Sequence, residues 1–221
     1  MISVAIDGPA GAGKSTIAKT AASKLGFIYV DTGALYRAVG LQCIRKGINT
    51  EDNAAIISVL PETEIKIVFR DGEQRVLLDG SDVSEEIRTE QASMTASKVS
   101  SVPEVRAFLL ELQRSFAKTD NVIMDGRDIG TVVLPDSKVK IFLTASPEAR
   151  ARRRTAQLEE KGVSADYETI LSDIIKRDHN DTHRETAPLK PAADSILLDT
   201  TELDLEQSIN RIIEIIKENV Q

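Results

Sequence analysis

The sequence of 221 residues is poor in cysteine, in long apolar runs and in positive charge, and each deficit excludes a class of protein. A single cysteine, Cys43, excludes an intrachain disulfide and a metal site built from several cysteines. Its mostly apolar neighbours predict a packed thiol. No apolar run approaches the about 18 residues that favour a membrane span. The net charge of −7 comes from 28 Lys and Arg against 35 Asp and Glu, and it argues against a broad nucleic-acid-binding face.

Three further patterns are missing. The N-terminus reaches Asp7 too soon for a signal peptide, so we expect a cytoplasmic protein. No Asn-Lys dipeptide occurs, although switch GTPases read guanine with an Asn-Lys-x-Asp loop. His179 and His183 have a spacing that can bind zinc, but no glutamate completes a His-Glu-x-x-His pattern. We therefore expect neither a zinc site nor a nucleic-acid or membrane partner.

Short apolar, β-branched runs alternate along the chain with longer helical patterns. Apolar residues follow one another within these runs, which is typical of strands covered on both faces of a parallel sheet. The pattern predicts a doubly wound α/β fold in a single domain. The predicted strands span residues 2–6, 27–30, 122–124, 139–143 and 196–198.

Two apolar stripes at helical spacing illustrate the predicted helices. The stripe within residues 105–116 follows residues 101–104, which fit a capping box. The stripe within residues 205–216 follows Asp204, with Gln207 three residues on. Both stripes are predicted to face the core and to carry no chemistry.

One stretch departs from the α/β alternation. Residues 64–69 nearly alternate between polar and apolar, Asp71-Gly72 signals a turn, and residues 75–79 form a second run. We predict an antiparallel hairpin inserted into the α/β core as a small subdomain.

Residues 8–15 match the phosphate-loop pattern G-x-x-x-x-G-K-[ST]. An apolar strand leads directly into the motif and a helical pattern leads out of it, which argues against a glycine-rich turn that binds nothing. Successive N–H groups and the helix dipole would then face one anion. Lys14 would reach the β- and γ-phosphates, and the Ser15 hydroxyl would ligate Mg²⁺. The residues predicted to bind ATP are Gly8, Pro9, Ala10, Gly11, Ala12, Gly13, Lys14, Ser15 and Thr16.

Arginines occur in small, separated clusters. Any single one of them could be a solvated surface charge. Together they suit an enzyme that holds two phosphorylated substrates end to end, because guanidinium groups are permanently charged and forked. These arginines are Arg37, Arg106, Arg127, Arg150, Arg152, Arg153, Arg154, Arg177 and Arg184.

The sequence resembles bacterial-type cytidylate kinases over essentially its full length. The most specific segment reads Asp-Gly-Arg-Asp at residues 125–128, followed by Gly-Thr-Val-Val at residues 130–133. Thr32 departs slightly, since many relatives have serine there. The other resembling segments are residues 8–16, 31–37, 97–106, 150–154 and 177–189.

The resemblance implies the fold of a P-loop kinase: a central parallel five-stranded sheet with helices on both faces, a small antiparallel β insert in the monophosphate-binding region and a short helical lid. The core would comprise about residues 1–31, 88–149 and 178–221. The insert would span about residues 32–87 and the lid about 150–165.

The resemblance also assigns roles in binding CMP. The phosphate clamp maps onto Thr32, Arg37, Arg127 and Arg184. Arg177 and Asp181 map onto sugar contacts, although residues four apart on a helix could also form an ordinary ion pair.

The base contacts map onto Ser97, Arg106 and Asp128. An ionised aspartate accepts a hydrogen bond from the N4 amino group of cytosine, and an arginine donates a hydrogen bond to N3 or O2. Uracil would turn O4 toward the carboxylate and leave two acceptors facing each other.

Catalytic roles fall to Lys14, Arg127 and the lid arginines Arg150, Arg153 and Arg154, which would stabilise charge on the transferred phosphoryl group. The arginine run could instead be a solvated helix face. Asp125 follows an apolar strand like a Walker B acid and could hold the metal through water. Alternatively, Asp125 caps the following turn.

We therefore predict an Mg²⁺-dependent kinase that transfers phosphoryl from ATP to CMP or dCMP, giving CDP or dCDP and ADP, without a covalent enzyme intermediate. We expect a monomer. Two alternatives are a kinase for UMP or another small acceptor, and a regulatory module that only binds ATP. A second phosphate clamp argues against the regulatory module.

Overall fold

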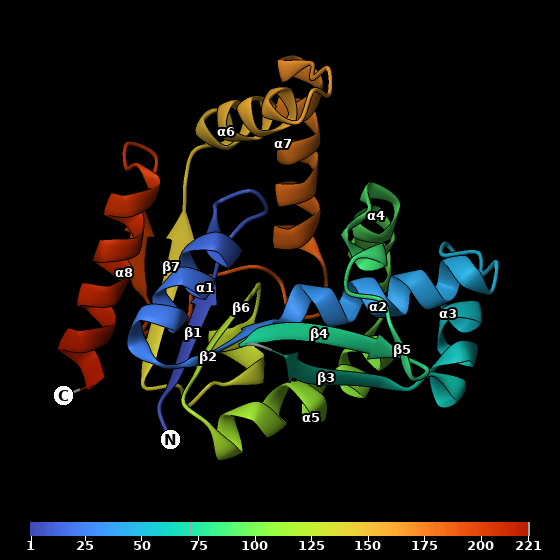
Figure 1. Ribbon diagram of the computed structural model, residues 1–221. Coiled ribbons are helices and arrows are strands. Elements are labelled where there is room, and N and C mark those ends of the chain that lie inside the picture. The colour runs from blue at the N-terminus through green and yellow to red at the C-terminus, as the bar shows by residue number, and fades with distance from the viewer. Residues whose placement is uncertain (71, 221) are drawn as a thin grey trace. The chain divides into compact units, whose positions relative to one another are not determined.

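The computed structural model describes residues 1–70 and 72–220 (Figure 1). These residues form two compact units. The hairpin unit is Val30–Asp120, and the P-loop unit comprises residues 2–29 and the chain from residue 121 onward.

The larger sheet has the strand order β2-β6-β1-β7-β8, and its strands lie in the P-loop unit except for Val30 and Asp31 at the end of β2. β1 pairs in parallel with β6 and β7, and β7 pairs in parallel with β8. All five predicted strands are confirmed, with ends that differ by one or two residues. The strands are β1 (Ser3–Asp7), β2 (Ile28–Asp31), β6 (Val122–Gly126), β7 (Val139–Thr144) and β8 (Ile196–Asp199).

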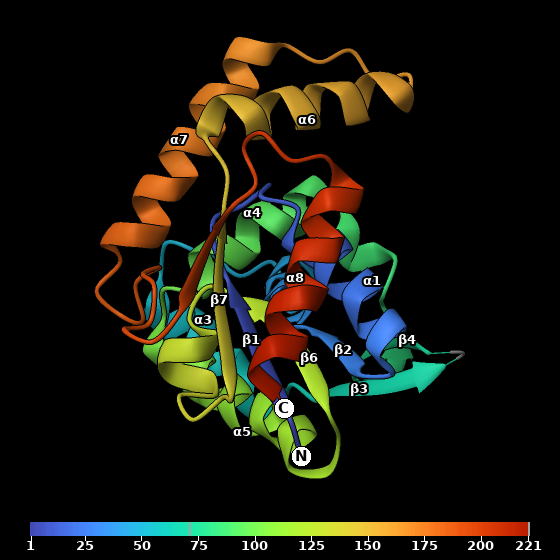
Figure 2. The same cartoon turned by 90° about the vertical axis from the view of Figure 1, so that its left-hand side faces the viewer.

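Four helices belong to the P-loop unit. α1 (Lys14–Leu25) and α8 (Leu205–Val220) bury their apolar residues in one core with β1 and β7. α6 (Pro147–Glu160) begins beyond the carboxyl end of β7 and packs against α7 (Tyr167–His183), and Figure 2 shows α8 running alongside the sheet. A short π-helical segment, Ile129–Val133, follows β6.

The hairpin unit has its own apolar core, in which the largest fully buried side chains include Leu35, Ile56, Leu78 and Leu109. The buried thiol of Cys43 lies in the same core, as predicted. Its helices are α2 (Thr32–Arg45), α3 (Asn53–Val59), α4 (Glu90–Val99) and α5 (Pro103–Thr119), with 3₁₀ turns at Leu60–Glu62 and Glu86–Arg88.

The predicted hairpin is confirmed. β3 (Ile65–Arg70) pairs antiparallel with β4 (Glu73–Leu78), and Gly72 has a positive φ of 77°. Asp71, the other residue of the predicted turn, lies outside the described residues. A third strand, β5 (Ser81–Asp82), was not predicted because it is too short to show a pattern.

The two predicted helix caps have different outcomes. At α8, Asp204 and Gln207 exchange hydrogen bonds of 2.7 and 3.0 Å, which confirms the cap. The capping box predicted at residues 101–104 is wrong: α5 begins at Pro103, its N-cap is Val102, and no side chain caps it. Proline fits the first helical position because its missing N–H would have no partner there.

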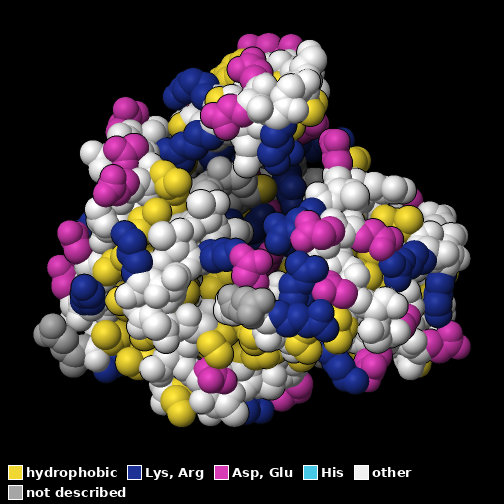
Figure 3. All heavy atoms as spheres, viewed as in Figure 1, with side chains coloured by type: hydrophobic (Ala, Val, Ile, Leu, Met, Phe, Trp, Pro, Cys, Tyr) yellow, Lys and Arg dark blue, Asp and Glu magenta, His cyan; other side chains and the backbone are white. Residues whose placement is uncertain are grey.

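Over residues 1–70 and 72–220, no helix combines the length and the apolar character needed to cross a membrane. Figure 3 shows acidic and basic side chains interspersed over the face that it presents.

Candidate active site

The phosphate loop connects β1 to α1 through three glycines with positive φ. Gly8 has a φ of 153°, and a Cβ there would lie 1.9 Å from the carbonyl oxygen of Leu143, so only glycine fits. Gly13 is the N-cap of α1, and no side chain caps the helix. The N–H groups at this end of α1 are therefore oriented toward an anion that approaches the loop.

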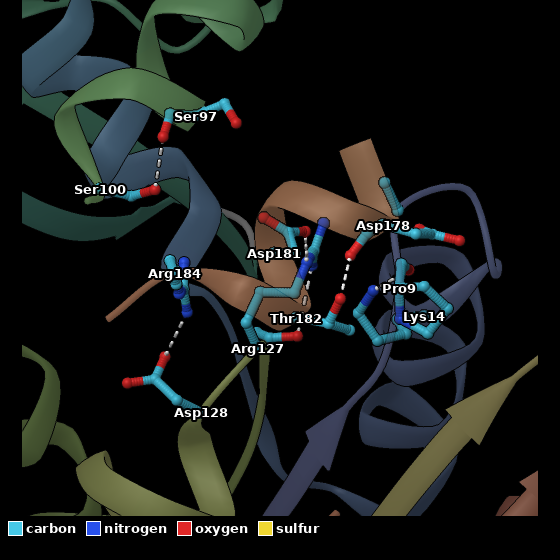
Figure 4. Close-up of polar contacts among 12 residues, drawn as sticks. Pro9, Lys14, Ser97, Ser100, Arg127, Asp128, Asp178, Asp181, Thr182 and Arg184 are labelled. Carbon is cyan, nitrogen blue, oxygen red and sulfur yellow. Dashed lines mark hydrogen bonds and ion pairs between the residues drawn. The ribbon is translucent and has the colours of Figure 1, made fainter. Parts of the chain in front are cut away.

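Lys14 begins α1 and is 5% exposed. Its Nζ donates to the carbonyl oxygen of Pro9 at 2.7 Å (Figure 4). Burial, followed by the nearby charge of Arg127, lowers the pKa of Lys14 to about 7. A phosphate beside Lys14 would favour its charged form.

Asp125 lies on β6, and its carboxylate accepts hydrogen bonds from two hydroxyl groups. Ser15 Oγ donates to its Oδ2 at 2.9 Å, and the Tyr29 hydroxyl donates to its Oδ1 at 2.8 Å. The carboxylate therefore faces the serine of the phosphate loop, and this arrangement favours the Walker B alternative over the turn cap. The sequence motifs do not predict the hydrogen bond from Tyr29 to this carboxylate.

Arg127 follows Asp125 by two residues and binds a carboxylate on α7. Its Nε donates to Asp181 Oδ2 at 2.8 Å, and Figure 4 shows the two side chains pointing toward each other. Burial alone would raise the pKa of Asp181, but the charge and hydrogen bond of Arg127 hold it below its usual value. The charges of Arg184 and Arg177 also lower this pKa. Asp181 is thus an ionised acceptor among three arginines.

Asp128 and Arg184 form a second buried pair in the same unit. The Nη2 of Arg184 lies 3.9 Å from Asp128 Oδ1 (Figure 4). Arg184 Nε also donates to the carbonyl oxygen of Ala187 at 2.7 Å. The ion pair between Arg184, at the end of α7, and Asp128 links this helix to the segment that follows β6.

Asp7 is a site residue that the motifs did not reveal. It is the last residue of β1, and its two carboxylate oxygens accept the N–H groups of Ile129 and Gly130 at 2.7 and 2.8 Å. Burial raises the pKa of Asp7 to about 6 despite these hydrogen bonds. Asp7 therefore fixes the backbone directly after Asp128.

The three predicted lid arginines on α6 differ in their surroundings. Arg150 is 2% exposed and donates to the carbonyl oxygen of Ala10 in the phosphate loop at 2.9 Å. Its guanidinium also binds both carboxylate oxygens of Asp178 on α7. Arg150 is therefore not part of a solvated face.

The other two are more accessible. Arg153 donates to the carbonyl oxygens of Thr200 and Leu203, the latter at 3.1 Å. Arg154 is exposed and donates to Gln157 on its own helix at 2.8 Å. Of the three arginines, only Arg154 fits the alternative interpretation of the run as a solvated helix face.

The hairpin unit holds the other predicted acceptor residues. Thr32, which is buried, begins α2, and Arg37 on the same helix pairs with Asp31 at 2.7 Å. Arg106 on α5 donates to the carbonyl oxygen of Ser100 at 3.2 Å. Ser97 lies on α4, where its own carbonyl oxygen accepts from the Ser100 hydroxyl at 2.9 Å (Figure 4).

The predicted CMP-binding residues thus divide between the two units. The hairpin unit contains Thr32, Arg37, Ser97 and Arg106, whereas the P-loop unit contains Arg127, Asp128, Arg177, Asp181 and Arg184. Within the P-loop unit, the structure brings Arg127 to Asp181 and Asp128 to Arg184.

A parallel sheet, a glycine-rich loop leading into α1 and a strand carboxylate facing the loop serine define a P-loop nucleotide-binding protein. One solved structure, an uncharacterized protein from Eubacterium ventriosum, matches with a TM-score of 0.54 at 14% identity. The match covers 98% of this chain and 99% of that one, and it supports the fold alone.

The sequence comparisons identify the family. The family model for cytidylate kinase matches residues 4–218. A cytidylate kinase of Caldicellulosiruptor bescii is 52% identical over 214 residues, covering 97% of this chain and 95% of the relative. One of Carboxydothermus hydrogenoformans is 52% identical over 213 residues, with 96% of each chain covered. The chain belongs to the cytidylate kinase family.

Proposed function

We propose that this protein transfers the γ-phosphoryl group of ATP to CMP or dCMP, giving CDP or dCDP and ADP. The observation that carries the proposal is the match, at 52% identity over nearly the whole of both chains, to proteins named cytidylate kinase. Such a reaction needs one site for the phosphates of ATP and another for the phosphate of the acceptor. The phosphate loop supplies the first, and the arginines paired with carboxylates, Arg127 and Arg184, supply positive charge for the second.

In this proposal, residues 8–16 bind the phosphates of ATP, and Lys14 contacts the β- and γ-phosphates. Ser15 would ligate Mg²⁺ and Asp125 would hold it through water, because their hydroxyl and carboxylate oxygens, 2.9 Å apart, are the hard donors that this ion prefers. Bound Mg²⁺ would neutralise charge on the phosphate oxygens. Tyr29 would keep the Asp125 carboxylate in a fixed orientation.

The acceptor phosphate would bind to Thr32, Arg37, Arg127 and Arg184. Each of these arginines already lies beside a carboxylate: Asp31, Asp181 and Asp128, respectively. These carboxylates would orient the guanidiniums before the phosphate arrives, which lowers the entropic cost of binding.

The remaining acceptor contacts are proposed for the nucleoside. Arg177 and Asp181 would contact the sugar, and the low pKa of Asp181 keeps an acceptor ready for a hydroxyl group. Ser97, Arg106 and Asp128 would read the base.

Catalysis would rest on positioning and electrostatics, without a covalent enzyme intermediate. Lys14 and Arg127 would stabilise charge on the transferred group. Arg150, Arg153 and Arg154 would add to this stabilisation of charge. Arg150 also holds α6 to the phosphate loop, Arg153 would have to leave the carbonyl oxygens of Thr200 and Leu203, and the exposed Arg154 would turn toward a bound nucleotide. Residues 150–165 would serve as the lid, residues 32–87 as the acceptor-binding insert, and residues 1–31, 88–149 and 178–221 as the core.

ADP release measured in parallel with CMP, dCMP, UMP and AMP tests the proposal. We expect rapid release with CMP or dCMP and slow release with ATP alone, because closure around both substrates keeps water out. Equal release with every acceptor, or faster release with UMP, would contradict the choice of substrate. ATP binding without acceptor-dependent ADP release would favour a regulatory module. We also propose a cytoplasmic monomer, which sedimentation of the purified protein can test for its oligomeric state.

A further inference from the structure

Gln74 on β4 makes a two-point contact with the backbone of Asp31 at the end of β2. The N–H of Asp31 donates to Gln74 Oε1 at 2.8 Å, and Gln74 Nε2 donates to the carbonyl oxygen of Asp31 at 3.2 Å. One side-chain amide thus satisfies both backbone groups of one residue, as a neighbouring strand would. Both residues belong to the hairpin unit.

The carboxylate of Asp31 makes two further hydrogen bonds. Its Oδ1 accepts the N–H of Ala34 at 3.1 Å and caps α2, and its Oδ2 accepts from Arg37 Nη2 at 2.7 Å. The position of Arg37 therefore depends on where the backbone of Asp31 is fixed.

Glycine at position 33 leaves room for the side chains of Asp31 and Arg37. A Cβ on Gly33 would lie 3.1 Å from both Asp31 Oδ1 and Arg37 Nη1. Arg37 Nε is buried and has no hydrogen-bond partner among the described residues. A buried donor of this kind is satisfied when an anion binds, which requires the guanidinium to be held in the right place.

We infer that Gln74 is a positioning residue for the acceptor phosphate: the β insert acts through Asp31 to set the orientation of Arg37. The inference rests on the proposed function, in which Arg37 binds the phosphate of CMP. A glutamine suits the task because its amide provides both a donor and an acceptor, whereas a glutamate at neutral pH provides acceptors only.

The substitution Gln74→Met tests this role, because methionine has similar length but cannot replace either hydrogen bond. We expect KM for CMP to rise about fivefold, with kcat and KM for ATP within about twofold of their original values. The matched control is Gln91→Met, the same substitution at an exposed position on α4, which should leave all three constants unchanged.

A double-mutant cycle separates positioning of Arg37 from a general loss of structure. In an Arg37→Ala background, Gln74→Met should raise KM for CMP by less than about 1.5-fold, because the group that it positions is gone. The same fivefold loss in both backgrounds, or an unchanged KM in the single variant, overturns the inference. If Gln74→Met does not fold, Gln74→Glu replaces it: it keeps the acceptor for the Asp31 N–H but places a second carboxylate oxygen against the Asp31 carbonyl oxygen, so it should raise KM for CMP by at least the same factor.

The wild-type protein serves as the reference for both proposals. CMP-dependent ADP release by the wild type together with an unaffected Gln74→Met variant contradicts the role of Gln74 and leaves the proposed function standing. A wild-type protein that releases no ADP with CMP or dCMP contradicts the proposed function, and the inference falls with it.

Discussion

Arg127 and Asp181 form an ion pair with a 2.8 Å separation that joins the end of β6 to α7. The Asp181 side chain is 8% exposed and that of Arg127 is 21% exposed. A buried carboxylate without its partner is costly, so the Asp181 carboxylate depends on Arg127 to remain charged.

We predict that Arg127→Ala mainly damages the use of CMP and leaves ATP binding nearly unchanged. The loss of a charged donor from a phosphate site typically costs about 3 kcal/mol or more of transition-state stabilisation. Isothermal titration with each nucleotide measures the change in binding, and kcat/KM for CMP measures the loss of transition-state stabilisation. Arg152→Ala, at an exposed position on α6, is the matched control. Weakened ATP binding with intact CMP binding would mean that the donor and acceptor sites have been exchanged.

The strands and the phosphate loop could be predicted because their signals are local. Each strand of a parallel sheet is buried on both faces and reads as one apolar run. Gly8 and Gly13 occupy fixed positions in a motif whose backbone conformation only glycine adopts easily. For the same reason, the cap at Asp204 and Gln207 could be read from four consecutive residues.

The supporting residues could not be predicted, because their partners are distant in sequence. Asp7 binds the N–H of a residue 122 positions later, and nothing in its neighbourhood marks it as more than the end of a strand. Gln74 and Asp31 are separated by 43 positions. The false capping box at residues 101–104 has a local cause: the sequence pattern fits, but Pro103 sets the start of α5 and makes Val102 the N-cap.

Lys14→Met should abolish phosphoryl transfer and change how stability depends on pH. The folded state lowers the pKa of Lys14 from 10.5 to about 7, so between these values the unfolded chain binds more protons than the folded one. Lys14 therefore makes the free energy of unfolding rise as the pH increases from about 7 toward 10, and the variant should lose this contribution.

Urea unfolding of the nucleotide-free protein at several pH values between 7 and 10 measures this slope. The variant should also be at least as stable as the wild type at pH 7, because it no longer buries an ammonium group. Near-normal turnover by a folded Lys14→Met protein would remove the assignment of the phosphate loop.

Binding of a bisubstrate analogue should slow hydrogen exchange in residues 150–165 if they close as the lid. The structure refines this expectation, since Arg150 is already anchored to Ala10 and Asp178 and its turn of α6 should be protected before the ligand binds. The increase in protection should therefore be largest toward Glu160. Unchanged exchange throughout the segment would place the lid elsewhere.

Asp128→Asn should narrow the CMP/UMP ratio of kcat/KM. A carboxylate accepts from cytosine N4 and repels uracil O4, whereas the amide of asparagine can turn its NH₂ toward O4. Both kcat/KM values should fall somewhat, because Asp128 lies 3.9 Å from the proposed phosphate ligand Arg184. Its backbone is held in place by Asp7 through the next two N–H groups, so the substitution should change the side-chain chemistry without moving the residue.

Arg106→Ala provides the comparison for this base-reading role. If Arg106 donates to O2, the acceptor that both pyrimidines present, its loss should lower kcat/KM for CMP and for UMP together and leave the CMP/UMP ratio nearly constant. If Asp128 only orients Arg184, Asp128→Asn will instead reduce activity with CMP, dCMP and UMP by the same factor. Steady-state kinetics of both variants with the three acceptors separates these outcomes. An unchanged CMP/UMP ratio in Asp128→Asn would exclude a base-reading role for this carboxylate and leave the preference for cytosine to Ser97.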